Sequence, residues 1–116
     1  MDNLFKSLGD ENRLRIINLL TDDELCVCEI EAILETTQSN ISRHLTRLRQ
    51  EGIVVFEKKS QWTYYKINPG FIENNKLLYE YLAEKMKLNN KFINDLENLL
   101  KYKNSGMSCD NINPVK

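Results

Sequence analysis

Two short amphipathic segments separated by a tight polar break constrain the fold of this chain more than any other feature. Apolar side chains recur at helical spacing up to Glu35, and again from Gln38 to Gln50. Thr36-Thr37 interrupts the pattern, and Thr37 is a good N-cap for the second segment. The apolar positions are Ile30, Ile33, Leu34, Ile41, Leu45 and Leu48. Two helices joined by so short a turn are predicted.

The second predicted helix is polar and basic on the side opposite its apolar stripe. Ser39, Arg43 and Thr46 point away from the stripe, flanked by Ser42 and Arg47. A short turn followed by a helix with such an outer face is typical of a DNA-reading helix-turn-helix.

A β-hairpin is predicted directly after this pair. Gly52 ends the second helix, and residues 53–56 and 62–67 are β-branched or aromatic. A polar loop separates them and contains Lys58, Lys59, Ser60 and Gln61. A hairpin with a basic tip in this place predicts a wing.

The remaining segments are predicted to be helical and to form a dimer. Residues 4–8 carry a short apolar stripe, and Asp10 can cap a helix that extends to Leu20. After Pro69-Gly70 one long helical pattern carries more apolar surface than a small domain needs. The predicted fold is mainly α with a β-hairpin wing, a winged helix-turn-helix that dimerises through its N- and C-terminal helices. Residues 1–103 form this domain, and residues 104–116 form a flexible polar tail that carries Cys109.

Charge is distributed unevenly along the chain. The formal net charge is −1, but residues 37–67 carry six basic side chains against two acidic ones. Residues 1–36 carry nine acidic side chains against three basic ones. The sign of the charge on the contacting surface, rather than the net charge of the chain, decides whether a phosphate backbone is attracted. The middle third is therefore the candidate DNA-binding part of an otherwise acidic chain.

Cys26 and Cys28 lie at the head of the first predicted helix. A period of 3.6 residues separates alternate residues by about 200°, so the two thiols can share an ion only where the helix is starting or distorted. The chain has three cysteines, an odd number that makes no disulfide framework. No secretory pattern and no membrane-length apolar stretch is found, so we expect a cytoplasmic protein with reduced thiols. Metal binding or redox chemistry remains for the pair.

Four stretches, in this order and spacing, resemble the ArsR/SmtB family of metal-sensing winged-helix repressors: LGDENRLRIINLL, ELCVCEI, TTQSNISRHLTRLRQEGIV and WTYYKI. The resemblance covers roughly residues 4–67. In that family ELCVCE is the signature of a site for thiophilic ions such as As(III), Sb(III), Cd(II), Pb(II) or Bi(III). The resemblance implies a homodimer that binds double-stranded operator DNA without the inducer and releases it when the inducer binds. The residues that it assigns to DNA are Gln38, Ser39, Ser42 and Arg43 in the major groove, with Lys58 and Lys59 on the minor-groove side.

The third ligand is open. In the arsenic-responsive pattern a third cysteine lies three residues after the second, and here that position is Glu31. Cys109 can supply a third sulfur from the same subunit or across the dimer, which suits As(III) or Sb(III). The acidic cluster of residues 22–24 and Glu29, with Glu31 as a conceivable carboxylate ligand, favours Cd(II) or Pb(II) instead. The resemblance also implies a second type of family site, on the last helix, that uses histidines and carboxylates. The last helix here has no histidine, so zinc or nickel sensing at that site is not expected. His44, the one histidine, is expected to cap or to contact phosphate.

The leading hypothesis is a homodimeric repressor that leaves its operator when As(III) or Sb(III) binds Cys26 and Cys28, with Cys109 as a candidate third ligand. A Cd(II) or Pb(II) sensor of the same family is one alternative, and a metal-independent thiol redox regulator is another. A protein-interaction module with a vestigial winged helix would show no salt-dependent DNA binding. An enzyme is not expected, because the chain has no partner acid for His44, no glycine-rich phosphate loop and no second histidine for a catalytic zinc.

Overall fold

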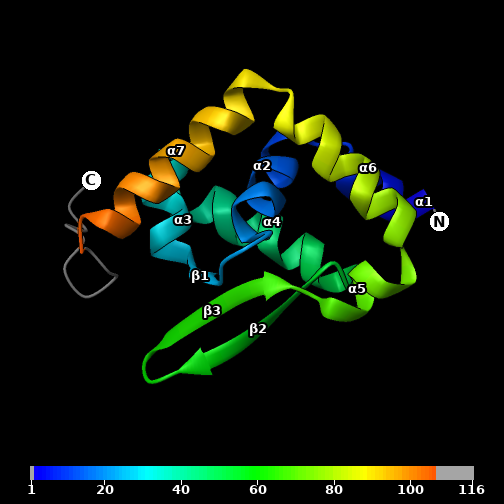
Figure 1. Ribbon diagram of the computed structural model, residues 1–116. Helices are drawn as coiled ribbons and strands as arrows, with labels where there is room; N and C mark the ends of the chain where they lie inside the picture. The colour runs from blue at the N-terminus through cyan, green and yellow to red at the C-terminus, as the bar shows by residue number, and fades with distance from the viewer. Residues whose placement is uncertain (1, 107–116) are drawn as a thin grey trace.

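The computed structural model describes residues 2–106, so Cys109 lies outside the described part of the chain. The elements are, in order, α1 (Asp2–Leu8), α2 (Glu11–Leu20), β1 (Leu25–Cys26), α3 (Val27–Leu34), α4 (Gln38–Gln50), β2 (Val54–Lys59), β3 (Trp62–Ile67), α5 (Pro69–Asn74), α6 (Lys76–Lys87) and α7 (Asn90–Asn104). In Figure 1 the β2–β3 hairpin projects from one side of the helical body, and α6 and α7 cross the opposite side. The predicted mainly α fold with a β-hairpin wing is confirmed.

The helix-turn-helix forms as its sequence pattern predicts. The Thr37 side chain accepts a hydrogen bond from the backbone N–H of Asn40 at 3.2 Å, which caps the start of α4. α3 ends at Glu35, which adopts a left-handed backbone conformation with φ 55°. The apolar stripes of both helices are buried in one core that α2, the hairpin and α7 share. The predicted bounds of α4, Gln38 to Gln50, are those of the structure.

One strand is absent from the sequence prediction. Leu25 and Cys26 pair antiparallel with Tyr65 and Tyr64 of β3, which gives a three-stranded sheet in the order β1-β3-β2. Two residues are too few to show the alternation by which a strand is recognised. Cys26 therefore lies opposite Tyr64 in the sheet of the wing as well as leading into α3.

The prediction of one long C-terminal helix was wrong, because this part of the chain forms three helices. Pro69 opens α5 at its first turn rather than breaking the chain, after Asn68 caps it. Asn75 separates α5 from α6, and the Asn89 side chain caps α7 by accepting from the backbone N–H groups of Lys91 and Phe92. Asparagine side chains that compete for backbone hydrogen bonds thus divide a continuous apolar pattern.

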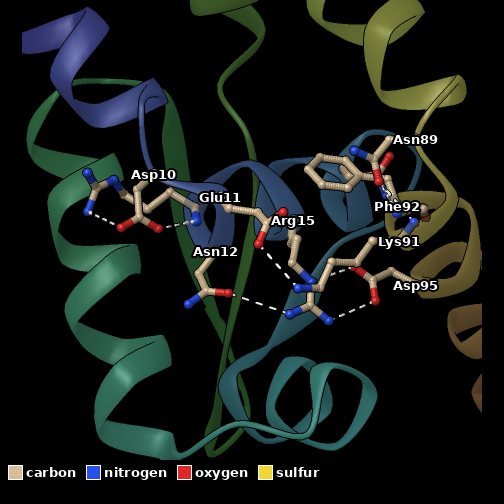
Figure 2. Close-up of polar contacts among 10 residues, drawn as sticks. Asp10, Glu11, Asn12, Arg15, Asn89, Lys91, Phe92 and Asp95 are labelled. Carbon is tan, nitrogen blue, oxygen red and sulfur yellow. Dashed lines mark hydrogen bonds and ion pairs between the residues drawn. The ribbon is translucent and has the colours of Figure 1, made fainter.

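Polar contacts fix α7 against α2 (Figure 2). The Arg15 guanidinium donates to both carboxylate oxygens of Asp95, at 2.7 and 2.9 Å, and Asp95 is only 1% exposed. The Asn18 side chain also donates to the Phe92 carbonyl at 3.0 Å. A bidentate pair of this kind restricts both position and orientation. The far end of α7 is thereby directed over α3 and β1 (Figure 1).

Candidate functional site: a thiol pair beside a DNA-reading helix

The two cysteines come together at the junction of strand and helix. Cys26 is the N-cap of α3 and has an extended backbone, whereas Cys28 already lies in the first turn. This change of backbone conformation brings the two Sγ atoms to 3.2 Å from each other. Cys26 is buried and Cys28 is half-buried. The requirement for a starting helix, set by the spacing of the thiols, is met.

The Glu29 carboxylate, predicted only as one of the acidic residues near the thiols, lies directly against Cys26. Glu29 Oε1 accepts a hydrogen bond from the backbone N–H of Cys26 at 3.0 Å and contacts Cys26 Sγ at 3.4 Å. Its other oxygen, Oε2, accepts from the Tyr102 hydroxyl of α7 at 2.5 Å. A signal for Glu29 was present, because an N-cap followed by glutamate at the third helical position is the capping-box spacing.

The acidic residues before the thiols are engaged by lysines. Asp23 pairs with Lys103 of α7 at 2.6 Å, and Glu24 pairs with Lys59 of the wing at 2.8 Å. The Lys59 pair raises the pKa of that lysine, chiefly through its hydrogen bond to Glu24. The negative charge around the thiols is therefore partly offset within the described chain.

The third ligand is not assembled in the part of the chain that the structure describes. Among residues 2–106, no three histidine, cysteine, aspartate or glutamate side chains are grouped so that they could hold a metal ion. Glu31 is half-buried and is not gathered with Cys26 and Cys28 into such a group. The other candidate, Cys109, lies outside the described residues.

The outer face of α4 carries the residues predicted to meet DNA. Gln38, Ser39 and Arg43 are exposed, and Ser42 is half-buried on the same helix. The opposite side of the helix is anchored, because Arg47 Nε donates to Ser7 Oγ at 3.0 Å. A helix that is held on its buried side and exposes a polar face can present donors and acceptors to base edges.

The wing carries its two lysines at the end of β2, not in a loop as predicted. β2 continues to Lys59, and the turn comprises Ser60, with φ 60°, and Gln61. Lys58 is exposed, whereas Lys59 is held by Glu24 and lies 5.6 Å from the centre of the Tyr64 ring. The hairpin itself projects away from the helical body (Figure 1).

His44, expected to cap or to contact phosphate, is buried beside Arg13. It is only 6% exposed, and its Nδ1 lies 3.4 Å from an Arg13 guanidinium nitrogen. Burial lowers the pKa of His44, and Arg13 and Arg43 add to this effect while Asp10 opposes it. Arg13 also donates to the carbonyls of Ser7 and Lys6. Arg13 and His44 therefore connect the end of α1 to the buried side of α4.

A helix-turn-helix whose second helix presents a polar face, followed by a basic hairpin, defines a winged helix-turn-helix DNA-binding domain. The chain belongs to the arsR family of bacterial regulatory proteins, whose family model matches residues 10–55. It is 39% identical over 102 residues to the arsenic resistance transcriptional regulator ArsR2 of Pseudomonas putida, an alignment that covers 87% of this chain and 84% of that protein. This is a family of transcriptional regulators, not of enzymes.

Further relatives differ in what their names state. The cadmium resistance regulatory protein CadC of Listeria innocua is 43% identical over 75 residues, which cover 64% of this chain and 59% of that protein. HlyU from Vibrio cholerae is similar in structure, with a TM-score of 0.59, 35% identity and coverage of 68% and 87%, and a second structure of it is of the reduced protein. A homodimeric winged domain from Mycobacterium bovis has a TM-score of 0.63 at 24% identity, with coverage of 72% and 78%. Within residues 2–106, no helix is both long and apolar enough to cross a membrane.

Proposed function

We propose that this regulator is a homodimeric repressor that leaves its operator when As(III) or Sb(III) binds Cys26 and Cys28, with Cys109 as the third ligand. The observation that carries the proposal is the 3.2 Å separation of the two sulfurs at the start of α3. Sulfur atoms that share one ion at bonds of about 2.3 Å lie roughly 3 to 4 Å apart. Thiolates also select thiophilic ions over hard ones.

The position of the thiols supports an effect on DNA binding. Cys26 and Cys28 begin the helix that directly precedes α4, and only Glu35, Thr36 and Thr37 separate the two helices. A ligand that holds both sulfurs constrains the first turn of α3 and, through it, the setting of α4. Ion and operator then prefer different states, which typically differ by about 1 to 3 kcal/mol in coupled systems.

The operator contacts proposed for α4 are Gln38, Ser39, Ser42 and Arg43, and those for the wing are Lys58 and Lys59. The exposure of Gln38, Ser39 and Arg43 supports direct contact with base edges or phosphates. Lys58 is free to approach the backbone, whereas Lys59 would exchange Glu24 for a phosphate. Because the proposed partner is operator DNA, we propose that the protein acts in the cytoplasm.

Cys109 is proposed as the third sulfur of the same protomer. Residues 23–29, which carry the two cysteines, form the thiol segment. The last turn of α7 contacts this segment through Tyr102–Glu29 and Lys103–Asp23. Cys109 follows Gly106 by three residues, and three extended residues reach roughly 10 Å. The site therefore lies close to the point from which the tail departs.

Charge supports As(III) and Sb(III) over divalent cations. The pairing of Asp23 with Lys103 and of Glu24 with Lys59 weakens the negative field that would attract Cd(II) or Pb(II). The Glu29 carboxylate beside Cys26 favours the cation alternative, since it could add an oxygen ligand. A thiol redox switch is the second alternative, and the short distance between the two sulfurs favours it.

The dimer is proposed to form through α1, α6 and α7. Large apolar side chains on these helices are exposed: Phe5, Leu77, Tyr81, Leu88, Ile93, Leu96 and Leu100. Single exposed apolar residues are ordinary, but Ile93, Leu96 and Leu100 recur at one exposed face of α7, next to the face that holds α2. A second copy would cover this face.

The test is fluorescence polarisation with DNA from upstream of the gene, using reduced protein titrated with As(III), Sb(III), Cd(II) and Pb(II), beside Cys109→Ser. We expect release by As(III) and Sb(III), weakened by about tenfold or more in the variant as a bond to the ion is lost. Release by Cd(II) or Pb(II) alone, indifferent to Cys109, would replace the proposal with the cation sensor. Release by diamide and recovery with a reductant, with no response to ions, would replace it with the redox switch.

A further inference from the structure

A continuous set of contacts joins the thiol pair to the last turn of α7. Glu29 uses both carboxylate oxygens, one for the backbone N–H and Sγ of Cys26 and the other for the Tyr102 hydroxyl. Tyr102 lies 73 positions further along the chain. The local capping of α3 and a tertiary contact between α3 and α7 therefore meet on a single side chain.

Burial makes this carboxylate a well-positioned group rather than a surface side chain. Glu29 is 7% exposed, and a buried carboxylate is costly unless its oxygens are hydrogen-bonded. Burial, followed by the hydrogen bond to Glu29, raises the pKa of Tyr102, so its hydroxyl remains a donor at neutral pH. The 2.5 Å distance between the Tyr102 hydroxyl and Glu29 Oε2 is at the short end for a hydrogen bond between two oxygens.

The same turn of α7 makes a second contact, on the other side of the thiol segment. Lys103 pairs with Asp23, which precedes β1, so neighbouring residues of α7 hold the segment before and after Cys26. Half-exposed pairs such as this one stabilise weakly. The buried Tyr102–Glu29 contact is therefore the stronger link, and the Arg15–Asp95 pair fixes the helix that carries it.

We propose that Glu29 and Tyr102 are positioning residues of the thiol pair, and that through them ion occupancy at Cys26 and Cys28 is transmitted to α7. This inference rests on the proposed function. An ion bonded to Cys26 Sγ takes the place of the thiol proton that Glu29 Oε1 accepts at 3.4 Å, so Glu29 is displaced from the sulfur. Since the other oxygen is held by Tyr102, the displacement acts on α7, whose exposed apolar face carries Ile93, Leu96 and Leu100. Ion binding then affects the dimer surface as well as α4.

The test removes one oxygen atom with Tyr102→Phe and uses Tyr79→Phe as the matched control. Tyr79 is a half-buried tyrosine on α6 whose ring packs edge-on against Phe71. Operator affinity is measured without ion and with saturating As(III), and thermal melting checks the fold. We expect Tyr102→Phe to reduce the effect of As(III) on operator affinity by about five- to tenfold, in line with the loss of one hydrogen bond. Tyr79→Phe should respond as the unmodified chain does.

Two further measurements separate positioning from stability and from the inducer's identity. Glutamine serves in the capping box as glutamate does, so Glu29→Gln should keep the melting temperature near that of the unmodified chain and still weaken the As(III) response. In a Cys109→Ser background, the rate of alkylation of Cys26 and Cys28 by iodoacetamide should change by about threefold or more in Tyr102→Phe, since the setting of the thiols controls their reactivity.

The outcomes distinguish the two proposals. If the unmodified chain ignores As(III), the proposed inducer is wrong, and the alkylation rates still decide whether Tyr102 positions the thiols. If both variants match the unmodified chain in As(III) response and in alkylation rate, the positioning role is overturned. The same conclusion holds if they lower only the melting temperature.

Discussion

At the scale of single residues, the contrast between two ion pairs on the α2–α7 interface shows where charge stabilises this protein. Arg15 and Asp95 have side chains that are 15% and 2% exposed, whereas those of Lys91 and Glu11 are 51% and 57% exposed (Figure 2). A buried charge that loses its partner is left uncompensated, but an exposed one is solvated by water. The two pairs join the same helices, so they form a matched comparison.

Asp95→Ala should therefore lower the free energy of unfolding by about 3 kcal/mol, the usual cost of breaking a buried pair. Glu11→Ala should change it by about 0.5 kcal/mol or less, since the pair that it removes is exposed. Urea denaturation at one fixed protein concentration measures both. Equal effects of the two substitutions would show that the buried pair does not hold α7.

His44 predicts a pH dependence of stability. Burial lowers its folded-state pKa below the ordinary value of 6.5, so between these two values the unfolded chain binds more protons than the folded one. The unfolding free energy contributed here is fully present above pH 6.5 and is lost as the pH falls towards the folded-state pKa. No other histidine titrates in this range, because the sequence contains one.

We expect His44→Gln to be less sensitive than the unmodified chain when urea midpoints at pH 7.5 and pH 5.5 are compared. Glutamine has no proton to gain in this window, so the loss on acidification should shrink. An identical loss in both proteins would mean that other groups cause it.

At the scale of elements, the sequence predicted those parts whose structure is decided locally. The bounds of α4 followed from the Thr37 cap and the apolar stripe, and the hairpin followed from its β-branched runs. β1 and the division of the C-terminal helices did not, since pairing with Tyr64 and Tyr65 and capping by Asn89 depend on tertiary context. The two thiols were predicted, but the contact of Glu29 with Cys26 and Tyr102 was not, because it depends on the position of α7.

The reading helix and the wing should contribute differently to operator binding. Arg43→Ala should cost about 1 to 3 kcal/mol on the operator and less on unrelated DNA, as expected for a base contact. Lys58→Ala should weaken both DNAs equally and reduce the slope of log affinity against log salt by about 0.9, as expected for one phosphate contact. Titrations at several salt concentrations measure these effects. A uniform loss for Arg43→Ala would remove it from base recognition.

At the scale of the whole molecule, α7 contacts the helical core and the thiol segment and also carries the proposed dimer surface. One face packs on α2 through Arg15–Asp95, its last turn contacts the thiol segment through Tyr102, and its outer face is apolar. The dimer proposed for this outer face would place two reading helices on one operator, so that protein symmetry matches the half-sites.

Leu100→Glu tests the dimer, because a charge at a 59% exposed position should disturb an apolar interface without disturbing the core. We expect the variant to sediment as a monomer at concentrations where the unmodified chain is a dimer, and to lose most operator affinity. Glu97→Gln, on an exposed part of the same helix, serves as the control. A Leu100→Glu variant that remains dimeric would assign the interface to another surface.

The central claim is that an ion held by Cys26 and Cys28 controls the affinity for DNA, and the most direct measurement is operator release by As(III) from Cys28→Ser. Serine keeps the size of this half-buried side chain and removes one sulfur, so operator binding without the ion should match that of the unmodified chain. The account predicts that the variant stays on the operator at As(III) concentrations that release the unmodified chain. Release of both proteins at the same As(III) concentration would contradict it.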